Sequence, residues 1–529
     1  MKRFRFAVFT AWVLALLLSA ADATHATTLR WAGRGDVGSM DPHSFNEGFS
    51  RAVNGHVYEQ LVRHDRQLRH TPALAERWEV VNDTTWRFTL RTGVRFQDGT
   101  ALTAADAVFS IERAQHPTSQ QAVFARKLGK AVQIDERTFE LRLDAPNPLV
   151  LDNQLSVAIM SRAWCKQHGV ERPPDFTKKE EAHSMRHAMG TGPFMLESFE
   201  PGVKTVLVRN PSWWGTFEGN VTRVVYTPIT NDATRTAALL SGALDLTLDA
   251  PTQDLPRLAQ EPSIKLLNGL ENRIVFLGMD QQRNELKYAS VKGRNPFRDP
   301  RVREAFALAI DTEALKAATM RGQSRPTACM AMAPIGCYAA ELDARPPADA
   351  AKARRLLAEA GYADGFEITL DCPNDRYVND QSICIAVAGM LSRVGVKVRV
   401  DARSRSIFFP KIDSSDTSFW LYGWGGGVTD PQSLLDPLVR TVDPKRNPNA
   451  GGKDVRFSDA ELDRLIDAAA VEMNVERRRT LLADAQRRTA AMHYWLPLHW
   501  QMVTWASRRN VTPVPMPDNV VRLHWVRVD

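Results

Sequence analysis

The chain has 529 residues, of which 44% are hydrophobic and 24% are charged, a composition typical of a soluble protein large enough for several domains. The formal net charge of +7 comes from interspersed charges of both signs, which argues against nucleic-acid binding. The sequence lacks the catalytic and nucleotide-binding motifs GxSxG, HExxH, SxxK and Walker A. No motif therefore indicates catalysis, and we expect that the protein is not an enzyme.

The N-terminus has the layout of a secretory signal peptide. Lys2, Arg3 and Arg5 precede an uncharged apolar run over residues 6–18, and small residues follow it. Cleavage is expected after Ala23 or Ala26, so we assign residues 1–26 to a Sec-type signal peptide and the mature protein to the periplasm. The alternative is a membrane anchor, for which the apolar run is short.

Five cysteines are present, an odd number that permits at most two internal disulfides and leaves one thiol over. The closely spaced pairs are Cys329 with Cys337 and Cys372 with Cys384. We expect both bridges to form and Cys165 to stay free.

The first half of the mature chain reads mainly as strands and hairpins. A strand opens it, and a helix follows Thr103, whose hydroxyl can cap it, with Asp106 in the first turn. The other expected elements are hairpins over 78–90 and 131–143, a helix-like polar segment over 171–189, and a helix from Asn231 to Gly242.

The second half alternates helices with strands, which predicts α/β lobes. Asp299 and Pro300 are a good N-cap and first residue for a helix reaching residue 318. The further expected elements are helices over 349–360, from Asn379 to Gly395, from a Ser458/Glu461 capping box and over 474–493, and strands over 366–370, 396–400 and 497–505.

Motifs in a fixed order resemble a known family over nearly the whole mature chain. They read LAERWEVVNDTTWRFTLRTGVRFQDGTALTAADAVFS, GTGPFMLESFEPG, NPSWWG, ALLSGALDL, PFRDPRVREAFALAID, RLLAEAGYADGF and GWGGGVTDPQSLL. In these residues the chain resembles the bacterial extracellular solute-binding proteins of family 5. The resemblance implies an α/β fold of two lobes, with an extra domain inserted in the first lobe and a ligand cleft between the lobes.

The resemblance also sets the expected domain boundaries. We assign 27–65 and 186–275 to the first lobe, 66–185 to its inserted subdomain, 276–495 to the second lobe, and 496–529 to a return to the first lobe. The implied function is that of a monomeric periplasmic subunit that delivers a small polar solute, peptide or peptide-like, to the permease of an ABC importer. A secreted hydrolase with dispersed catalytic residues and a protein that presents its ligand to a sensor are the alternatives.

A glycine-rich loop at 423–431 follows an expected strand. In peptide-binding relatives this loop borders the ligand, a tryptophan packs there, and an aspartate three residues later holds the peptide's α-ammonium group. The resemblance points to Trp424 as a ligand platform, but the position three residues later is Gly427, which cannot form that ion pair. Asp430 is an alternative partner, although an Asp-Pro pair also makes turns.

Two neighbours of this loop are further candidates for ligand contact. Gly425 lets backbone approach a ligand closely or merely serves a tight loop, and Tyr422 faces either the core or the cleft. Phe45 and Asn46 match the early loop that lines the cleft in relatives.

Arg376 lies between an expected strand and an expected helix, where ligands bind in open α/β sheets. Its guanidinium can hold a carboxylate or phosphate, or instead pair with Asp375 or Asp380. We expect no cofactor and no metal, because His183 and His187 have helical metal-ligand spacing but no third ligand nearby in sequence.

Overall fold

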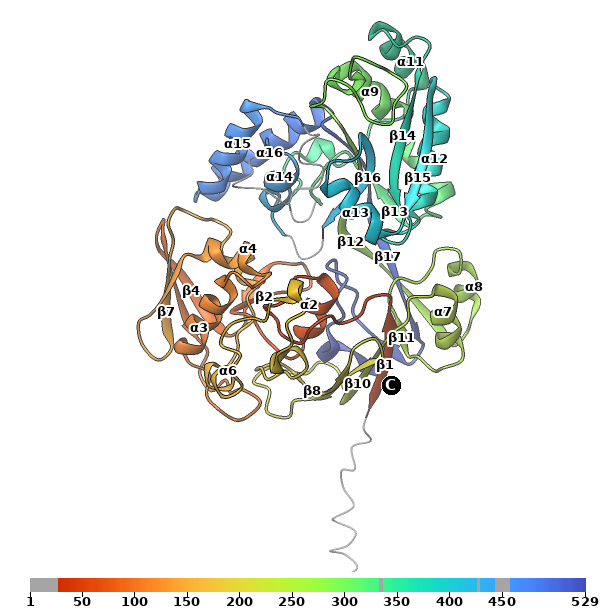
Figure 1. The fold of residues 1–529 in the computed structure, drawn as a ribbon. Coiled ribbons are helices and arrows are strands. Elements are labelled where there is room, and N and C mark those ends of the chain that lie inside the picture. The colour runs from red at the N-terminus through yellow and green to blue at the C-terminus, as the bar shows by residue number, and fades with distance from the viewer. Residues whose placement is uncertain (1–26, 333–335, 426–428, 443–456) are drawn as a thin grey trace, which may run out of the picture.

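The computed structural model describes residues 27–332, 336–425, 429–442 and 457–529. The expected signal peptide and Gly427 therefore lie outside the described residues. The described chain forms two α/β lobes, one above the other in Figure 1, as the sequence predicted. No described helix is long and apolar enough to span a membrane.

The first lobe is built around mixed strands. β1 pairs in parallel with β10 and β11, and β10, β9 and β8 continue the sheet in antiparallel order. Its strands are β1 (Thr28–Gly33), β8 (Phe194–Glu200), β9 (Lys204–Arg209), β10 (Arg223–Pro228) and β11 (Leu246–Thr247). Three helices accompany them, α2 (Gly48–Asn54), α7 (Asp232–Leu240) and α8 (Leu255–Gln260).

A separate four-stranded antiparallel sheet, in the order β4-β5-β7-β6, forms one side of this lobe (Figure 1). All its strands and helices fall inside 66–185, the range assigned to the inserted subdomain. They are β4 (Ala75–Asn82), β5 (Thr85–Leu90), α3 (Ala104–Gln115), α4 (Ala122–Ala125), β6 (Lys130–Gln133), β7 (Thr138–Arg142), α5 (Val150–Gln154) and α6 (Arg162–Gln167). α3 begins with the capping box expected from Thr103 and Asp106.

The second lobe sandwiches its strands between two sets of helices, so its strands are apolar on both faces. Phe419 and Leu421 face one buried cluster, and Trp420 faces the other. The strands are β14 (Phe366–Pro373), β15 (Val396–Arg403) and β16 (Phe419–Gly425). The helices are α9 (Pro300–Ala309), α11 (Ala350–Glu359), α12 (Asp380–Ser392), α13 (Arg405–Asp413), α14 (Gln432–Leu438), α15 (Ala460–Val471) and α16 (Val475–Ala491).

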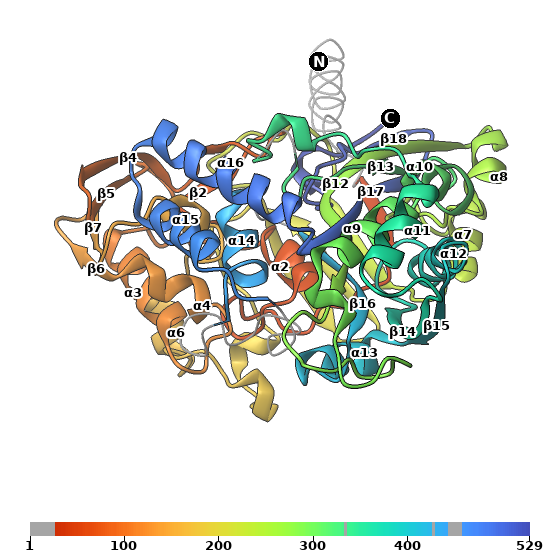
Figure 2. The same cartoon turned by 90° about the horizontal axis from the view of Figure 1, so that it is seen from above.

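Two long antiparallel strands connect the lobes (Figure 1 and Figure 2), β12 (Ile264–Met279) and β17 (Trp495–Arg508). Their second-lobe halves pair with each other beside β16, and β17 ends against β11 of the first lobe. The expected boundaries at 275/276 and 495/496 therefore fall within these strands. Their register breaks between Leu270 and Ile274, where three residues of β12 oppose one of β17.

Four expected elements differ from the structure. Residues 171–189, which contain Pro173 and Pro174, form short 3-10 turns instead of a helix. The helix expected to reach residue 318 ends at Ala309, because Asp311 caps a new short helix. Asp459, not Ser458, caps α15. Asn379 adopts a left-handed backbone conformation at the start of α12 and uses its side chain elsewhere.

Both expected cysteine pairs are joined in the structure, Cys329 to Cys337 and Cys372 to Cys384, and Cys165 is a buried free thiol. The second bridge ties the end of β14 to α12. It therefore fixes both ends of the intervening segment, which carries Arg376.

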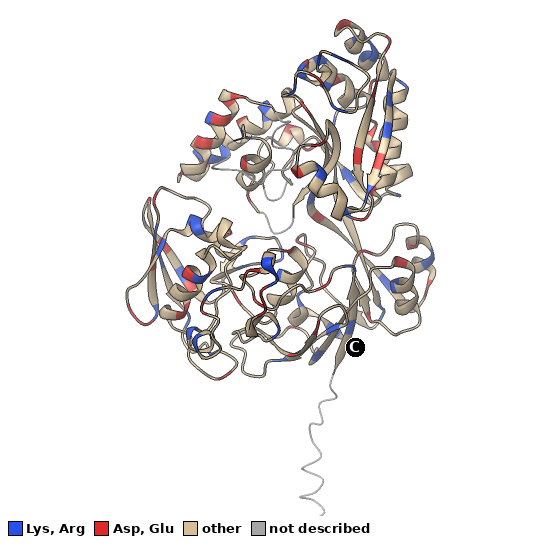
Figure 3. Cartoon of the chain, in the orientation of Figure 1, with Lys and Arg blue, Asp and Glu red and all other residues tan. Residues whose placement is uncertain are grey.

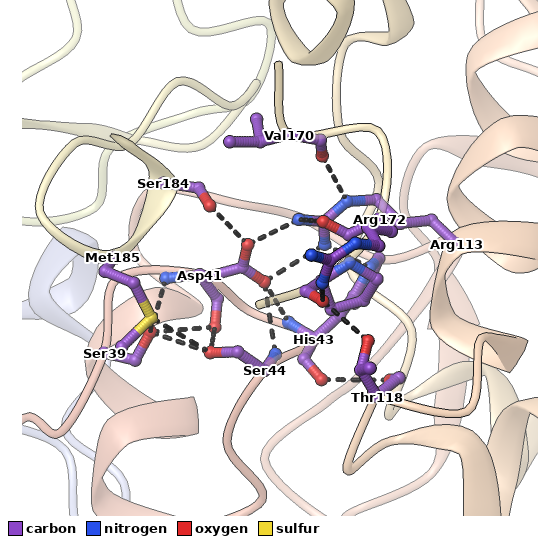
Figure 4. Close-up of polar contacts among 12 residues, drawn as sticks. Ser39, Asp41, His43, Ser44, Arg113, Thr118, Val170, Arg172, Ser184 and Met185 are labelled. Carbon is purple, nitrogen blue, oxygen red and sulfur yellow. Dashed lines mark hydrogen bonds and ion pairs between the residues drawn. The ribbon is translucent and has the colours of Figure 1, made fainter. Parts of the chain in front are cut away.

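A buried ion pair joins the early loop to the inserted subdomain (Figure 4). Asp41 and Arg113 are both fully buried, and the Asp41 carboxylate also accepts hydrogen bonds from the backbone of His43 and Ser44 and from the Ser184 hydroxyl. Burial opposes the charge of Asp41, but Arg113 lowers the pKa of this carboxyl to about 2. The loop that leads into α2 is thereby fastened to α3.

Candidate ligand-binding cavity

A cavity of about 1390 Å³ lies where the two lobes and the two connecting strands meet. The first lobe lines it with residues of α2 and of the segments around 231 and 249–253. The second lobe lines it with residues 374–379 and with Gly425, and the connecting strands contribute Glu271, Arg273 and Gln501. A cavity walled by both lobes is the geometry in which binding a ligand brings the lobes together.

Polar side chains at the register break of β12 line part of the cavity. Glu271 is held by Arg273, whose Nε lies 3.0 Å from the carboxylate, and by the side-chain amide of Gln501. The other end of the Gln501 amide accepts the backbone N–H of Val378 at 3.0 Å. Because Val378 follows Tyr377 in the second-lobe loop, this network couples the connecting strands to the loop that carries Arg376.

Arg376 reaches the cavity from this second-lobe loop. Asp380 accepts the backbone N–H groups of Arg376 and Tyr377, and the Tyr377 hydroxyl contacts the backbone of Gly423 in β16. The guanidinium lies over the Tyr377 ring at 5.3 Å. Among the described residues it has no carboxylate partner, so neither Asp375 nor Asp380 pairs with it. Burial, with Arg273 nearby, lowers its pKa.

The first-lobe wall of the cavity includes Asn46 and α2. The backbone N–H of Asn46 donates to the Gln120 side chain at 3.0 Å, which ties this part of the wall to the inserted subdomain. Glu47 caps α2 through the Ser50 N–H. Arg51 lines the cavity with its Nε buried, and within the described chain that atom has no hydrogen-bond partner.

Asp249 is a cavity residue that the sequence analysis missed. It takes a left-handed backbone conformation with φ 52°, which a residue with a side chain rarely adopts and which recurs at functional sites. One carboxylate oxygen accepts the Asn519 amide at 3.1 Å. No sequence motif marks Asp249, although a carboxylate close after an expected strand is a weak signal.

Of the expected site residues, Asn46, Arg376 and Gly425 line the cavity. Tyr422 and Trp424 instead share the side of β16 that faces the hydrophobic cluster of α14, α15 and α16, because alternate residues of a strand point to the same face. Phe45 stacks on Phe176 with ring centres 4.0 Å apart.

Asp430 is bound by side-chain and backbone groups of the second lobe. Both of its carboxylate oxygens bind Arg478, at 2.6 and 2.8 Å, and one also accepts the Gln432 N–H at the start of α14. The structure thus gives Asp430 a partner within the second lobe, as the turn interpretation allowed. A ligand cation would have to compete with a bidentate arginine pair.

Of the two histidines considered for metal binding, His183 is half-buried near the end of the inserted subdomain and His187 is exposed just after it. The rings of His168, His183 and His187 stack in parallel, each 4.0 Å from the next. Among the described residues, no group of three or more histidine, cysteine or acidic side chains is arranged to hold a metal ion.

The arginines that line the cavity differ in whether they have an acidic partner inside the protein. Figure 3 shows basic and acidic residues of both signs on both lobes. Several cations that line the cavity are neutralised inside the protein, such as Arg34 by Asp232 and Arg522 by Asp518. Arg51 and Arg376 have no acidic partner within the part of the chain that the structure describes. The wall can therefore offer charge-assisted hydrogen bonds to an acidic group of a solute.

Comparison with known proteins gives a consistent result. A sequence model of the bacterial extracellular solute-binding proteins, family 5 (middle region), matches residues 69–445, more than half of the chain. The glutathione-binding protein GsiB of Salmonella typhimurium is 25% identical over 493 residues, which cover 91% of this chain and 90% of the relative.

Solved structures share the fold. DppA from Helicobacter pylori, in complex with the peptide STSA, superposes with a TM-score of 0.76 at 22% identity, covering 95% of this chain and 98% of that one. AgaA from A. tumefaciens R10, in complex with agropinic acid, has a TM-score of 0.75 at 23% identity and covers 95% and 99%. With a two-lobe fold, an interlobe cavity and a family match over most of its length, the chain belongs to the bacterial extracellular solute-binding proteins of family 5.

Proposed function

We propose that this protein is the periplasmic solute-binding subunit of an ABC importer, and that it captures a small polar solute, peptide or peptide-like, and delivers it to the membrane permease. The observation that carries the proposal is the cavity, whose wall combines both lobes and both connecting strands. A solute in this position contacts both lobes at once when they are closed, so it binds the closed form more tightly and shifts the population toward it.

The relatives support a peptide-like ligand without fixing it. Proteins similar to this chain are described as binding glutathione, as complexed with the peptide STSA, and as complexed with agropinic acid. The relatives are binding proteins, and we propose that this chain likewise releases its solute unchanged. A pure sample incubated with its ligand should then give no product by mass spectrometry.

Within the cavity we assign the solute's carboxylate to Arg376, its ammonium group to Asp249 in place of the missing aspartate at Gly427, and backbone or amide contacts to Asn46 and Gly425. Support for Arg376 is its unpaired guanidinium in the cavity wall. Support for Asp249 is a carboxylate with one amide donor and a strained backbone facing the same cavity.

The proposal is tested by a thermal-shift screen of the mature protein, refolded to remove any bound solute, against peptides, amino-acid derivatives, opines, sugars and nickel. A ligand that binds only the folded state raises Tm by mass action. We expect a shift with peptides or peptide-like acids. A shift with nickel or sugars alone would contradict the proposed ligand class, and no shift at all would contradict solute capture.

Arg376→Gln should then weaken binding of the best acidic ligand at least tenfold, about 1.4 kcal/mol, measured by isothermal titration calorimetry. The matched control is Arg257→Gln, since Arg257 lies exposed on α8 away from the cavity. Equal affinity of Arg376→Gln and wild type would show that the carboxylate is held elsewhere.

A further inference from the structure

Two arginines in the cavity wall, one from each lobe, have no ion-pair partner in the described protein. Arg51 comes from α2 of the first lobe and Arg376 from the loop after β14 of the second. Other arginines around the same cavity do have partners, such as Arg34 with Asp232 and Arg273 with Glu271. Arg63 and Arg405 also line the cavity without an ion pair among the described residues, but their side chains are exposed, whereas those of Arg51 and Arg376 are half-buried.

Arg51 is the more unusual of the two. Its side chain is half-buried and its Nε is fully enclosed without an acceptor. The nearby Glu47 carboxylate binds the N–H and hydroxyl of Ser50, at 2.9 and 3.3 Å, and forms no ion pair with Arg51. Burial lowers the pKa of Arg51, with Glu47 opposing that effect.

The region around Arg376 adds positive charge. Arg405 lines the cavity beside it, with an exposed side chain and no acceptor among the described residues. Asp375, which could neutralise this region, accepts the Arg405 backbone N–H. The second-lobe wall thus presents two guanidinium groups, and among the described residues the Asp375 carboxylate forms an ion pair with neither of them.

A buried charge without a partner costs free energy, which proteins normally avoid by pairing it. A protein that leaves two guanidinium groups unpaired in one cavity gains stability once an anion reaches them. Because the groups come from opposite lobes, an anion on each would also hold the lobes together.

We propose that the solute is an acid with two anionic groups, one bound by Arg376 in the second lobe and the other by Arg51 in the first. This inference rests on the proposed function and narrows it from polar solutes in general to diacids. Compounds of this class include peptides with an acidic side chain or a γ-glutamyl group, and acidic opines.

The test compares diacids with a monoacid of similar size on the refolded mature protein. The diacids are glutathione, which has two carboxylates, γ-glutamylglycine and glutamyl dipeptides of different spacing, and the monoacid is trialanine. We expect at least one diacid to bind ten times more tightly than trialanine by calorimetry. If trialanine binds as tightly as every diacid, the diacid proposal fails while solute capture stands. If none of these peptides binds and the acidic opines of the thermal-shift screen give no shift either, the diacid proposal fails, whereas solute capture fails only if the whole screen gives no shift.

Arg51 is tested with the tightest diacid. Arg51→Gln should weaken its binding at least tenfold and change trialanine binding less than twofold, whereas Arg376→Gln should weaken both. Arg51→Lys should restore part of the affinity, and Arg257→Gln should change neither. Loss of affinity for trialanine equal to the loss for the diacid would assign Arg51 a structural role.

A second readout needs no ligand. If the only anionic partner of Arg51 is the solute, Arg51→Met removes an unpaired buried charge from the ligand-free protein. That variant should then melt at the same temperature as wild type or at a higher one. A fall in Tm of more than about 4 °C, corresponding to about 1 kcal/mol or more, would mean that Arg51 is paired within the folded protein. That result would overturn the proposal.

Discussion

Asp41 and Arg113 illustrate how a single buried pair can fix a cavity wall. Their side chains are both fully buried, and the Arg113 guanidinium also donates to the Val170 carbonyl and to Nδ1 of His43 (Figure 4). Nε2 of His43 lies 3.0 Å from the Ala158 carbonyl, so the neutral ring donates there and accepts from Arg113. The pair thus supplies hydrogen-bond partners for buried polar groups of both the early loop and the inserted subdomain.

Arg113→Met should therefore destabilise the protein by about 3–5 kcal/mol, because it leaves the Asp41 carboxylate buried without its cation. The measurement is chemical denaturation followed by fluorescence. The control is Arg66→Met, which removes an exposed pair with Glu218 and should cost about 1 kcal/mol or less. Similar losses of unfolding free energy for the two variants would show that the buried pair stabilises the protein no more than an exposed pair does.

At the residue scale the sequence predicted Asn46, Gly425 and Arg376 at the cavity, because each lies in a loop that the family resemblance or a strand-to-helix junction marks. It did not predict that Asp430 binds Arg478, since the partner lies 48 positions away on α16. Arg51 and Asp249 were missed because no local pattern shows that a charged residue will line a cavity formed by distant parts of the chain.

At the scale of elements, a loop of the second lobe contacts the inserted subdomain. The Thr429 hydroxyl, between β16 and α14, donates to the Asp152 carboxylate of α5. Nε2 of His70 lies 3.6 Å from the same carboxylate. Burial opposes the charge of Asp152, but the neighbouring His70 and the hydrogen bond from the Thr429 hydroxyl lower its pKa. The contact joins the lobes at a side of the cavity away from the connecting strands.

Asp152→Ala removes this contact and should shift the ligand-free protein toward the open form. Small-angle X-ray scattering should show a larger radius of gyration than for wild type. Thr429→Val should have the same effect, and the double variant should add little to either single one, because both remove one interaction. Unchanged scattering from both single variants would mean that the contact does not bias closure.

Elements with strong local signals were predicted well. Asp299 with Pro300, Asn231 and the Thr103 capping box all begin helices in the structure. Segments without such signals were predicted less well, because tertiary contacts determine their backbone conformation. Asn379, expected as a helix cap, instead bonds Thr252 of the first lobe and the Thr319 carbonyl.

At the scale of the whole molecule, buried histidines set the response to acid. Burial lowers the pKa of His64 and His499 to about 4, and burial together with neighbouring arginines lowers the pKa of His43 and His524 to about 3. In the unfolded chain a histidine titrates near pH ~6.5. Between about pH 6.5 and pH 3 the unfolded state therefore binds more protons, so stability falls as pH falls.

Differential scanning calorimetry should thus show Tm decreasing steadily from pH 7 to pH 4. Asp41 extends the decline at still lower pH, because its folded pKa of about 2 lies below its ordinary value of 3.8. His499→Gln should make the slope above pH 4 shallower, since it removes one buried titrating ring. A Tm that stays constant between pH 7 and pH 5 would contradict this account.

The position of β17 has a consequence for how the protein is made. In the chain it follows every other strand of its sheet, yet in the sheet it lies between β12 and β11, where the two lobes join. Until the residues of β17 emerge, the nascent chain lacks the strand that completes its largest sheet, and this sheet depends on contacts between distant parts of the sequence, which form slowly. Vectorial synthesis thus keeps the polypeptide from closing its two-lobe fold before β17 has been made.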